Sequence, residues 1–205
     1  MNKKRLLMLM GGNKRHTINL YPSDTYLYKV NTAINYSTEK TLLIRGVTFS
    51  YQRNTIMKFD VSSLSEKIII SAKLNLYLAS NSTGNATITL HNILAANSDM
   101  VFAQMTWDVK KTGTAWAGSN GCETANTDYN SVSFGTFNVA NGQTAGTKYE
   151  ITIANSIITG WVTNNYGFRF VSTNADVLYQ FHSSETDTAS YKPALEIVYG
   201  GAVIP

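Results

Sequence analysis

Short runs in which apolar and polar residues alternate recur along this chain, with turn residues between them. In residues 68–79, for example, Leu74, Leu76 and Leu78 alternate with polar side chains, so one face of the segment is apolar. A period of two places alternate side chains on opposite faces of a strand. The predicted strands are residues 17–20, 24–30, 41–44, 53–61, 68–79, 86–94, 132–139, 148–153, 166–172, 177–183 and 194–199. Strands this short and this closely spaced predict an all-β fold, a two-sheet jelly-roll β-sandwich.

Three segments between or beside these strands carry further signals. The turn at residues 82–85 joins segments 68–79 and 86–94, which we expect to form a long hairpin. Residues 153–163 have apolar side chains at helical spacing and predict one short helix. Residues 95–133 show few strand signals but contain Trp107 and Trp116. Loops of this length tend to be functional or anchored, so we expect this one to be packed.

Charge divides the chain into a basic N-terminal arm and a nearly neutral body. Residues 1–23 contain no acidic side chain and five of the 17 basic ones, which are Lys3, Lys4, Arg5, Lys14 and Arg15. The rest of the chain contains the other 12 basic residues and all 13 acidic ones. We therefore expect an arm at residues 1–16 and one jelly-roll domain at residues 17–205. Such an arm suits an acidic partner, either nucleic acid, a lipid surface or a protein face, or else is a solvated tail.

Targeting signals are weak. The apolar run after Arg5 spans only residues 6–10, shorter than the roughly 7–15 residues of a signal-peptide core. No run of about 18 apolar residues occurs, so we expect no membrane insertion. Cys122 is the single cysteine, which excludes an intrachain disulfide and mildly favours synthesis inside the cell. We interpret it as a buried apolar residue rather than a nucleophile.

Catalytic signatures are missing. The three histidines, His16, His91 and His182, are too far apart in sequence to form a metal-binding motif such as H-x-x-x-H. Neither the G-x-S-x-G motif of a serine nucleophile nor a phosphate-binding P-loop occurs. The nearest carboxylate pairs in sequence, Glu123 with Asp128 and Glu185 with Asp187, fit structural roles better than glycoside hydrolysis. The chain is therefore predicted to be no enzyme, with no catalytic residue, no metal site and no cofactor.

Several short motifs nevertheless follow one another along the chain in one order. This motif series comprises Asp24-Thr25-Tyr26, Arg53, residues 56–61, residues 70–77, Thr106-Trp107, Trp116, Trp161, residues 165–168, Phe181, Ser183-Ser184-Glu185 and residues 193–197. This order and spacing resemble the DNRLRE domain family of carbohydrate-binding-module-like jelly rolls, over roughly residues 22–199. The string that names the family does not occur in this chain. The resemblance implies a jelly-roll sandwich with a binding or scaffolding role, and no reaction.

The resemblance also bears on individual residues. It implies that Trp107, Trp116 and Trp161 fill the core. Sugar stacking is the alternative for Trp107 and Trp116 in the long loop, with the core favoured for Trp107 and both interpretations equal for Trp116. Tyr129, with Tyr26, Tyr28 and Tyr51, suits either a wet interface or a glycan-binding face. Glu185 occupies the family's Ser-x-Glu-like position, and we expect it to pair with Arg53 or Arg169.

Related jelly rolls often hold a structural Ca²⁺. Calcium needs six to eight oxygen ligands, of which Asp24, Asp60, Asp108 and Asp128 would supply some. The sequence contains no Asp-x-Asp loop, so structural calcium is an alternative rather than the expectation.

Two functions fit these observations. The first is a virion structural protein of a phage, namely a capsid decoration, head fibre or tail-associated protein that docks through its arm on other virion proteins or assembles with itself. It would be made in the host cytoplasm and released by lysis. Contact of the arm with nucleic acid stays open. The alternative is an extracellular carbohydrate-binding module that recognises cell-surface or extracellular polysaccharide, with Trp116 and Tyr129 as candidate glycan-binding residues.

Overall fold

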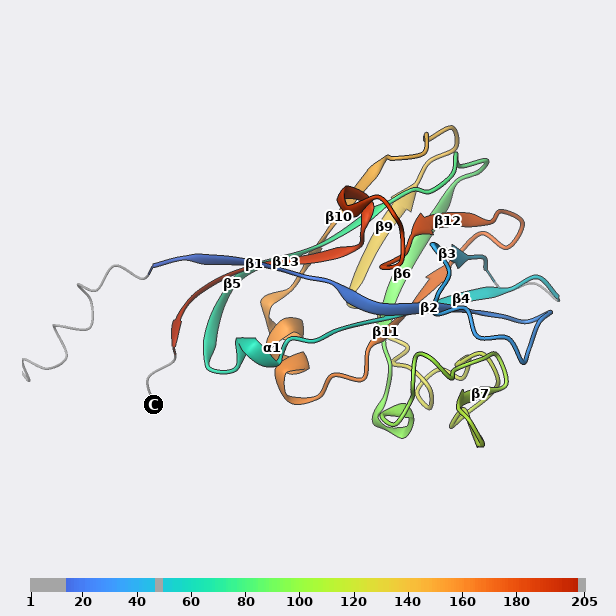
Figure 1. Ribbon diagram of the computed structural model, residues 1–205, viewed down its shortest axis with the longest axis horizontal. Helices are drawn as coiled ribbons and strands as arrows, with labels where there is room; N and C mark the ends of the chain where they lie inside the picture. The colour runs from blue at the N-terminus through green and yellow to red at the C-terminus, as the bar shows by residue number, and fades with distance from the viewer. Residues whose placement is uncertain (1–13, 47–49, 203–205) are drawn as a thin grey trace, which may run out of the picture.

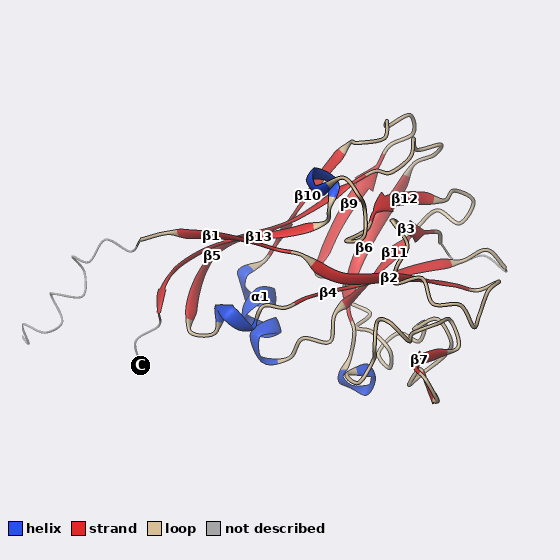
Figure 2. Cartoon of the chain, viewed as in Figure 1, coloured by secondary structure: helices blue, strands red, loops and turns tan. Residues whose placement is uncertain are grey.

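The computed structural model describes residues 14–46 and 50–202. Strands dominate this part of the chain, and helices are short (Figure 2). The strands are β1 (His16–Leu20), β2 (Pro22–Tyr28), β3 (Thr41–Ile44), β4 (Arg53–Phe59), β5 (Lys67–Tyr77), β6 (Ala86–Asn92), β7 (Val109–Lys111), β8 (Thr114–Ala115), β9 (Gly135–Val139), β10 (Lys148–Ile153), β11 (Phe168–Ser172), β12 (Tyr179–His182) and β13 (Ala194–Ala202). The helices are α1 (Asn155–Thr163) and three single 3₁₀ turns, η3 (Ser62–Leu64), η4 (Ala95–Asn97) and η5 (Ala189–Tyr191).

Two antiparallel sheets form the body of the molecule (Figure 1). One has the strand order β1-β13-β5-β10, and the other has the order β2-β4-β11-β6-β9. The smaller pairs β12-β3 and β7-β8 complete the fold. The chain passes repeatedly from one sheet to the other, as jelly-roll connections do. The predicted all-β sandwich with one short helix is confirmed.

The main core lies between the two sheets. Leu74 and Leu76 of β5 meet Phe168 and Phe170 of β11, and each of these side chains is about 1% exposed. The leucine face that the alternation in residues 68–79 predicted is therefore the core face. Burying a large apolar side chain contributes about 1.5–3 kcal/mol, which makes this layer the main source of stability.

A second apolar cluster lies on the outer face of the five-stranded sheet. Ile56 and Met57 are neighbours on β4, so they point to opposite faces, and Met57 enters the main core while Ile56 enters the second cluster. The segment between β6 and β9 covers Ile56 with Trp107, Trp116 and other apolar side chains (Figure 1). The prediction that this long loop is packed is confirmed. It also contains the β7–β8 hairpin, which the sequence did not predict.

The predicted hairpin of residues 68–79 and 86–94 is wrong. β5 pairs with β13 and β10, whereas β6 pairs with β11 and β9 in the opposite sheet. The apolar faces of β5 and β6 enter the main core from opposite sheets, with Leu74 and Leu76 on one side and Ile88 and Leu90 on the other. The turn between them is fixed to the β9–β10 connection, because Ser82 donates from its Oγ to the carbonyl of Ala140 at 2.5 Å.

The N-terminal end of the described chain lies on an extension of the four-stranded sheet. β1, the end of β13 and the start of β5 project beyond the rest of the sandwich (Figure 1). Lys14 and Arg15 are exposed and directly precede β1. Lys3, Lys4 and Arg5 lie outside the described residues. No helix within residues 14–46 and 50–202 combines the length and the apolar character needed to cross a membrane.

Candidate functional site

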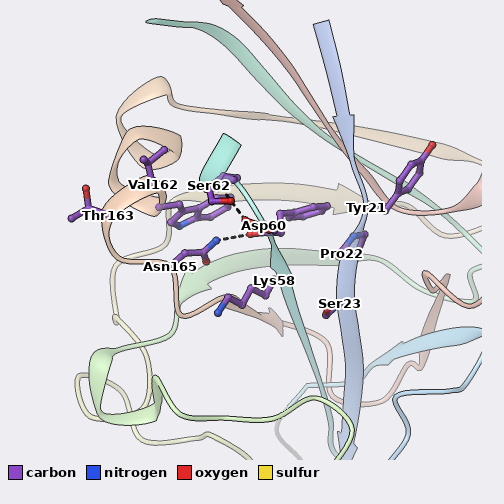
Figure 3. A pocket seen from close by; sticks show the side chains of 12 residues that line it. Tyr21, Pro22, Ser23, Lys58, Asp60, Ser62, Val162, Thr163 and Asn165 are labelled. Carbon is purple, nitrogen blue, oxygen red and sulfur yellow. Dashed lines mark hydrogen bonds between the residues drawn. The ribbon is translucent and has the colours of Figure 1, made fainter. Parts of the chain in front are cut away.

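A groove of about 510 Å³ opens between the start of β2, the end of β4 and the C-terminal half of α1 (Figure 3). Charged side chains line it, so we call it the charged groove. Its floor is apolar, since Phe59 is 1% and Trp161 is 6% exposed. The polar side chains of Lys58, Asp60 and Asn165 line its rim.

Trp161 gives the groove a rigid floor. Its indole ring stacks on Phe168, with ring centroids 5.5 Å apart and an interplanar angle of 3°. Its Nε1 donates a hydrogen bond to Oδ1 of Asn92 at 2.8 Å. The helical spacing of apolar residues in α1 directs Trp161 inward, so a helix of only nine residues holds it in place.

The rim groups are held in different ways. Asn165 is fixed at both ends of its amide, because Nδ2 donates to the Phe59 carbonyl at 2.6 Å and Oδ1 accepts from the Gly167 amide at 3.0 Å. Oδ1 of Asp60 accepts from the Ser62 amide at 3.0 Å. Hydrogen bonding from Ser62 holds the pKa of Asp60 below its usual value, so this carboxylate stays ionised at neutral pH.

The Lys58 ammonium has no hydrogen-bond or ion-pair partner within residues 14–46 and 50–202. Its charge contributes to the lowered pKa of Asp60, after the hydrogen bonds from Ser62. The rim therefore offers one free cationic donor and one anionic acceptor above an apolar floor. Tyr21 stands at the edge of the groove with 59% of its surface exposed, and its ring projects on the far side of β2 (Figure 3).

The three tryptophans all belong to the core. Trp107 is 4%, Trp116 5% and Trp161 6% exposed. Trp116 packs in the second cluster, and its Nε1 donates to the Thr106 carbonyl at 3.1 Å. Its ring thus leaves no face open to a sugar, and the glycan-binding alternative for Trp116 gives way to the core interpretation.

Tyr129 is half-buried on the outer face of the five-stranded sheet. The Arg169 guanidinium lies 4.5 Å from the centre of its ring, and His91 meets the ring edge-on at 5.4 Å. A glycan role for Tyr129 stays a prediction. Any sugar would have to use the ring face that Arg169 leaves free.

The predicted ion pair of Glu185 with Arg53 or Arg169 is wrong within the described chain. The Arg53 guanidinium stacks 3.8 Å from the centre of the Tyr28 ring, and Arg169 donates to the Cys122 carbonyl. Arg53 also donates to the Tyr51 carbonyl at 3.3 Å, and the Arg169 guanidinium also lies 4.5 Å from the centre of the Tyr129 ring. The Glu185 backbone N–H instead donates to Ser183 Oγ at 3.1 Å, and its carboxylate accepts from the Ser184 hydroxyl at 3.5 Å.

The acidic candidates lie in separate hydrogen-bond networks. Asp24 accepts from Ser184, Asp108 from Asn120 and Asp128 from amides of its own loop. Among the residues that the structure describes, no three His, Cys, Asp or Glu side chains lie close enough to hold a metal ion. Cys122 is fully buried, and burial raises the pKa of its thiol to about 12, which fits the predicted apolar role.

Sequence reasoning did not single out Lys58 or Asn165 as site residues, although both lie within the motif series. The alternation in residues 53–61 contains the signal for Lys58, because it places this side chain on the face opposite Met57 and Phe59. Nothing local indicates that α1 comes to lie beside that face.

Comparison with known proteins identifies the family. No curated protein matches the chain. The model of carbohydrate-binding module family 96 matches residues 17–199, which include both sheets, the long loop and the charged groove. The match supports the carbohydrate-binding-module-like part of the resemblance, and such modules are non-catalytic domains. The chain belongs to carbohydrate-binding module family 96.

Proposed function

We propose that this protein binds carbohydrate without transforming it, and that the charged groove holds a sugar ring. Membership of a carbohydrate-binding module family over residues 17–199 is the observation that carries this proposal. The groove lies inside the matched region and has a volume within the range of roughly 300–1,000 Å³ that is usual for ligand sites.

The chemistry of the groove suits a polyhydroxylated ring. Sugar hydroxyls accept hydrogen bonds from the Lys58 ammonium and donate them to the Asp60 carboxylate. Hydrogen bonds to ionised groups are about twice as strong as neutral ones. Lys58 has no ion pair to break among the described residues, so binding would use a donor that is already free.

Removing either charge should weaken glycan binding without unfolding the protein. We expect Lys58→Met and Asp60→Asn each to raise the Kd by about tenfold, since a hydrogen bond to a charged group contributes roughly 1.5–3 kcal/mol. The asparagine keeps an oxygen at the position that accepts from the Ser62 amide. The full chain is first screened on a glycan array, and the best ligand is then titrated by calorimetry.

Lys40→Met and Asp187→Asn are matched controls. These two residues form an exposed ion pair and do not line the groove, so the same changes of charge should leave the Kd unchanged. If all four variants bind alike, the sugar lies elsewhere. If no glycan on the array binds the wild-type protein, carbohydrate binding itself is wrong.

The virion role remains a separate prediction that depends on the arm. Lys14 and Arg15 are the two arm cations that the structure describes, and both are exposed. If the arm docks on a particle or on other copies, deleting residues 1–15 should abolish assembly while leaving β1 in place. Sedimentation velocity of the two proteins in 50 mM and 500 mM NaCl tests this. The same monomeric mass for both proteins at both salt concentrations would contradict the docking role.

A further inference from the structure

A second groove of about 490 Å³ lies on the other side of α1, between this helix, the end of β6 and the α1–β11 connection. None of the described residues that line it carries a charge. We therefore call it the uncharged groove. Its polar side chains are Asn92, Asn130, Asn164, Ser156 and Tyr166.

Three asparagine amides of this groove share one arrangement. In each, the side-chain oxygen accepts a hydrogen bond from within the protein. Oδ1 of Asn92 accepts from Trp161 Nε1 at 2.8 Å, and Oδ1 of Asn130 accepts from the Val132 amide at 2.9 Å. Both partners are donors only, which fixes the orientation of these amides. Oδ1 of Asn164 accepts from the Tyr166 hydroxyl at 3.2 Å.

This arrangement leaves three amide groups as donors. The Nδ2 atoms of Asn92, Asn130 and Asn164 have no hydrogen-bond partner in the described part of the chain. Each supplies up to two N–H donors, and the partly exposed Ile157 provides an apolar surface beside them. The backbone also ties the wall together, because the Asn130 amide donates to the Asn92 carbonyl at 2.8 Å.

The absence of charge in the lining selects the kind of ligand. A carboxylate that enters a groove without a cation loses part of its hydration and gains no ion pair. Hydroxyl, ring and acetamido oxygens lose less on leaving water and match neutral N–H donors. The lining therefore fits an uncharged sugar better than an acidic one.

We propose that the uncharged groove is a second glycan site and that it takes an uncharged sugar unit. This inference rests on the proposed carbohydrate binding and adds a separate subsite with its own selectivity. Trp161 lies between the two grooves and lines both of them. One protein molecule then holds two sugar units, one on each side of α1.

Gly160 provides a way to close the uncharged groove alone. It lines this groove and not the charged one, and a Cβ added there meets no atom within 4 Å. Its backbone is helical, so larger residues fit without strain. The variant Gly160→Phe should fill the groove, while Gly160→Ala adds one methyl group and serves as the matched control.

Nuclear magnetic resonance of the full chain tests the proposal directly. The probes are the uncharged methyl glycosides of glucose, galactose and mannose, and the methyl glycoside of glucuronic acid. We expect at least one uncharged glycoside to shift the side-chain amide signals of Asn130 and Asn164. Glucuronoside should shift them only at concentrations at least tenfold higher. Gly160→Phe should abolish these shifts and Gly160→Ala should retain them, with the amides beside Lys58 as reporters of the charged groove.

The outcomes separate this inference from the proposed function. Shifts confined to the amides beside Lys58 would overturn the second site and leave the charged groove standing. Shifts at the asparagines that Gly160→Phe does not remove, or equal binding of glucuronoside, would also overturn it. No shift at either groove with any glycoside would count against both proposals, whereas shifts only at the asparagines would support the second site alone.

Discussion

Replacing Asp128 with alanine is expected to lower the free energy of unfolding by about 3 kcal/mol or more, the largest single effect among the polar residues of the long loop. Asp128 is fully buried. Its carboxylate accepts from Asn97 Nδ2 at 2.9 Å and from the backbone amides of Gly118, Ser119 and Thr124 at 2.9, 3.1 and 2.9 Å. Removing it leaves these donors without their acceptor.

The pKa of Asp128 reflects the same balance. Burial alone raises the pKa, but the hydrogen bonds from Asn97 and from the three amides outweigh it, so the pKa lies below its usual value. The ionised carboxylate therefore stabilises the fold at neutral pH, and this contribution is lost as the pH falls through the lowered pKa. The segment that Asp128 ties together also covers Ile56 and Trp116, so its loosening would expose the second apolar cluster.

Thermal and urea unfolding of the variant measure this effect. In a domain of this size, about 3 kcal/mol corresponds to a fall in Tm of roughly 6–12 °C. Asp108→Ala is the control within the same loop, because Asp108 accepts one exposed hydrogen bond, from Asn120 at 2.8 Å. Its loss should be below about 1 kcal/mol. Equal losses for the two variants would show that the buried carboxylate does not organise the loop.

Much of the fold follows from local pattern. The predicted strand at residues 41–44 has the bounds of β3, and that at residues 148–153 has the bounds of β10. The predicted helix at residues 153–163 becomes α1, which begins two residues later because Ile153 still pairs with Ala72 of β5. Side-chain periodicity determines these elements, and tertiary contacts move only their ends.

Partner choice between strands was less predictable. The turn at residues 82–85 has residues typical of hairpins, yet β5 and β6 belong to different sheets. A turn sequence indicates that the chain reverses direction, and it does not determine which strands pair. The identity of the neighbour depends on contacts between segments far apart in the chain, such as β5 with β13. The β7–β8 hairpin was missed for a related reason, since its strands of three and two residues are too short to show a period.

The candidate site shows the same division. Trp107 and Trp161 are buried, as the motif series implied. Whether Trp116 is buried or exposed could not be predicted, because that depends on the path of the long loop. The charged groove combines Lys58 of β4 with α1, about a hundred residues further along the chain, so no local window contains it. Such a site becomes visible only once the sheets are placed.

Asp24 leads to the second large prediction, in which stability falls as the pH rises from about 4 to about 6. This carboxyl group is 3% exposed and faces the sandwich interior on β2. Burial raises its pKa to about 6, against the opposing hydrogen bonds from the Ser184 amide and hydroxyl. Nearby Glu185 raises the pKa further, and Lys192 lowers it.

The sign follows from proton binding. Between the unfolded value near 3.8 and the folded value of about 6, the folded state holds a proton that the unfolded state has lost, so ionisation favours unfolding. A shift of this size corresponds to about 3 kcal/mol once the pH exceeds 6. The Asp24→Asn variant keeps an oxygen that accepts from Ser184 and carries no charge. It should match the wild type near pH 4 and exceed its stability by up to about 3 kcal/mol at pH 8.

Urea unfolding of the wild type and of Asp24→Asn from pH 4 to pH 8 gives the difference between their free energies of unfolding as a function of pH. His91 and His182 have lowered pKa values because burial disfavours their charged forms, so they add stability as the pH rises through the same range. These contributions are common to both proteins and cancel in the difference. Asp176→Asn, which alters an exposed carboxylate, should give a flat difference curve. A flat curve for Asp24→Asn as well would mean that the Ser184 hydrogen bonds fully offset the burial of the charge, and that Asp24 ionises in the folded protein as easily as in the unfolded chain.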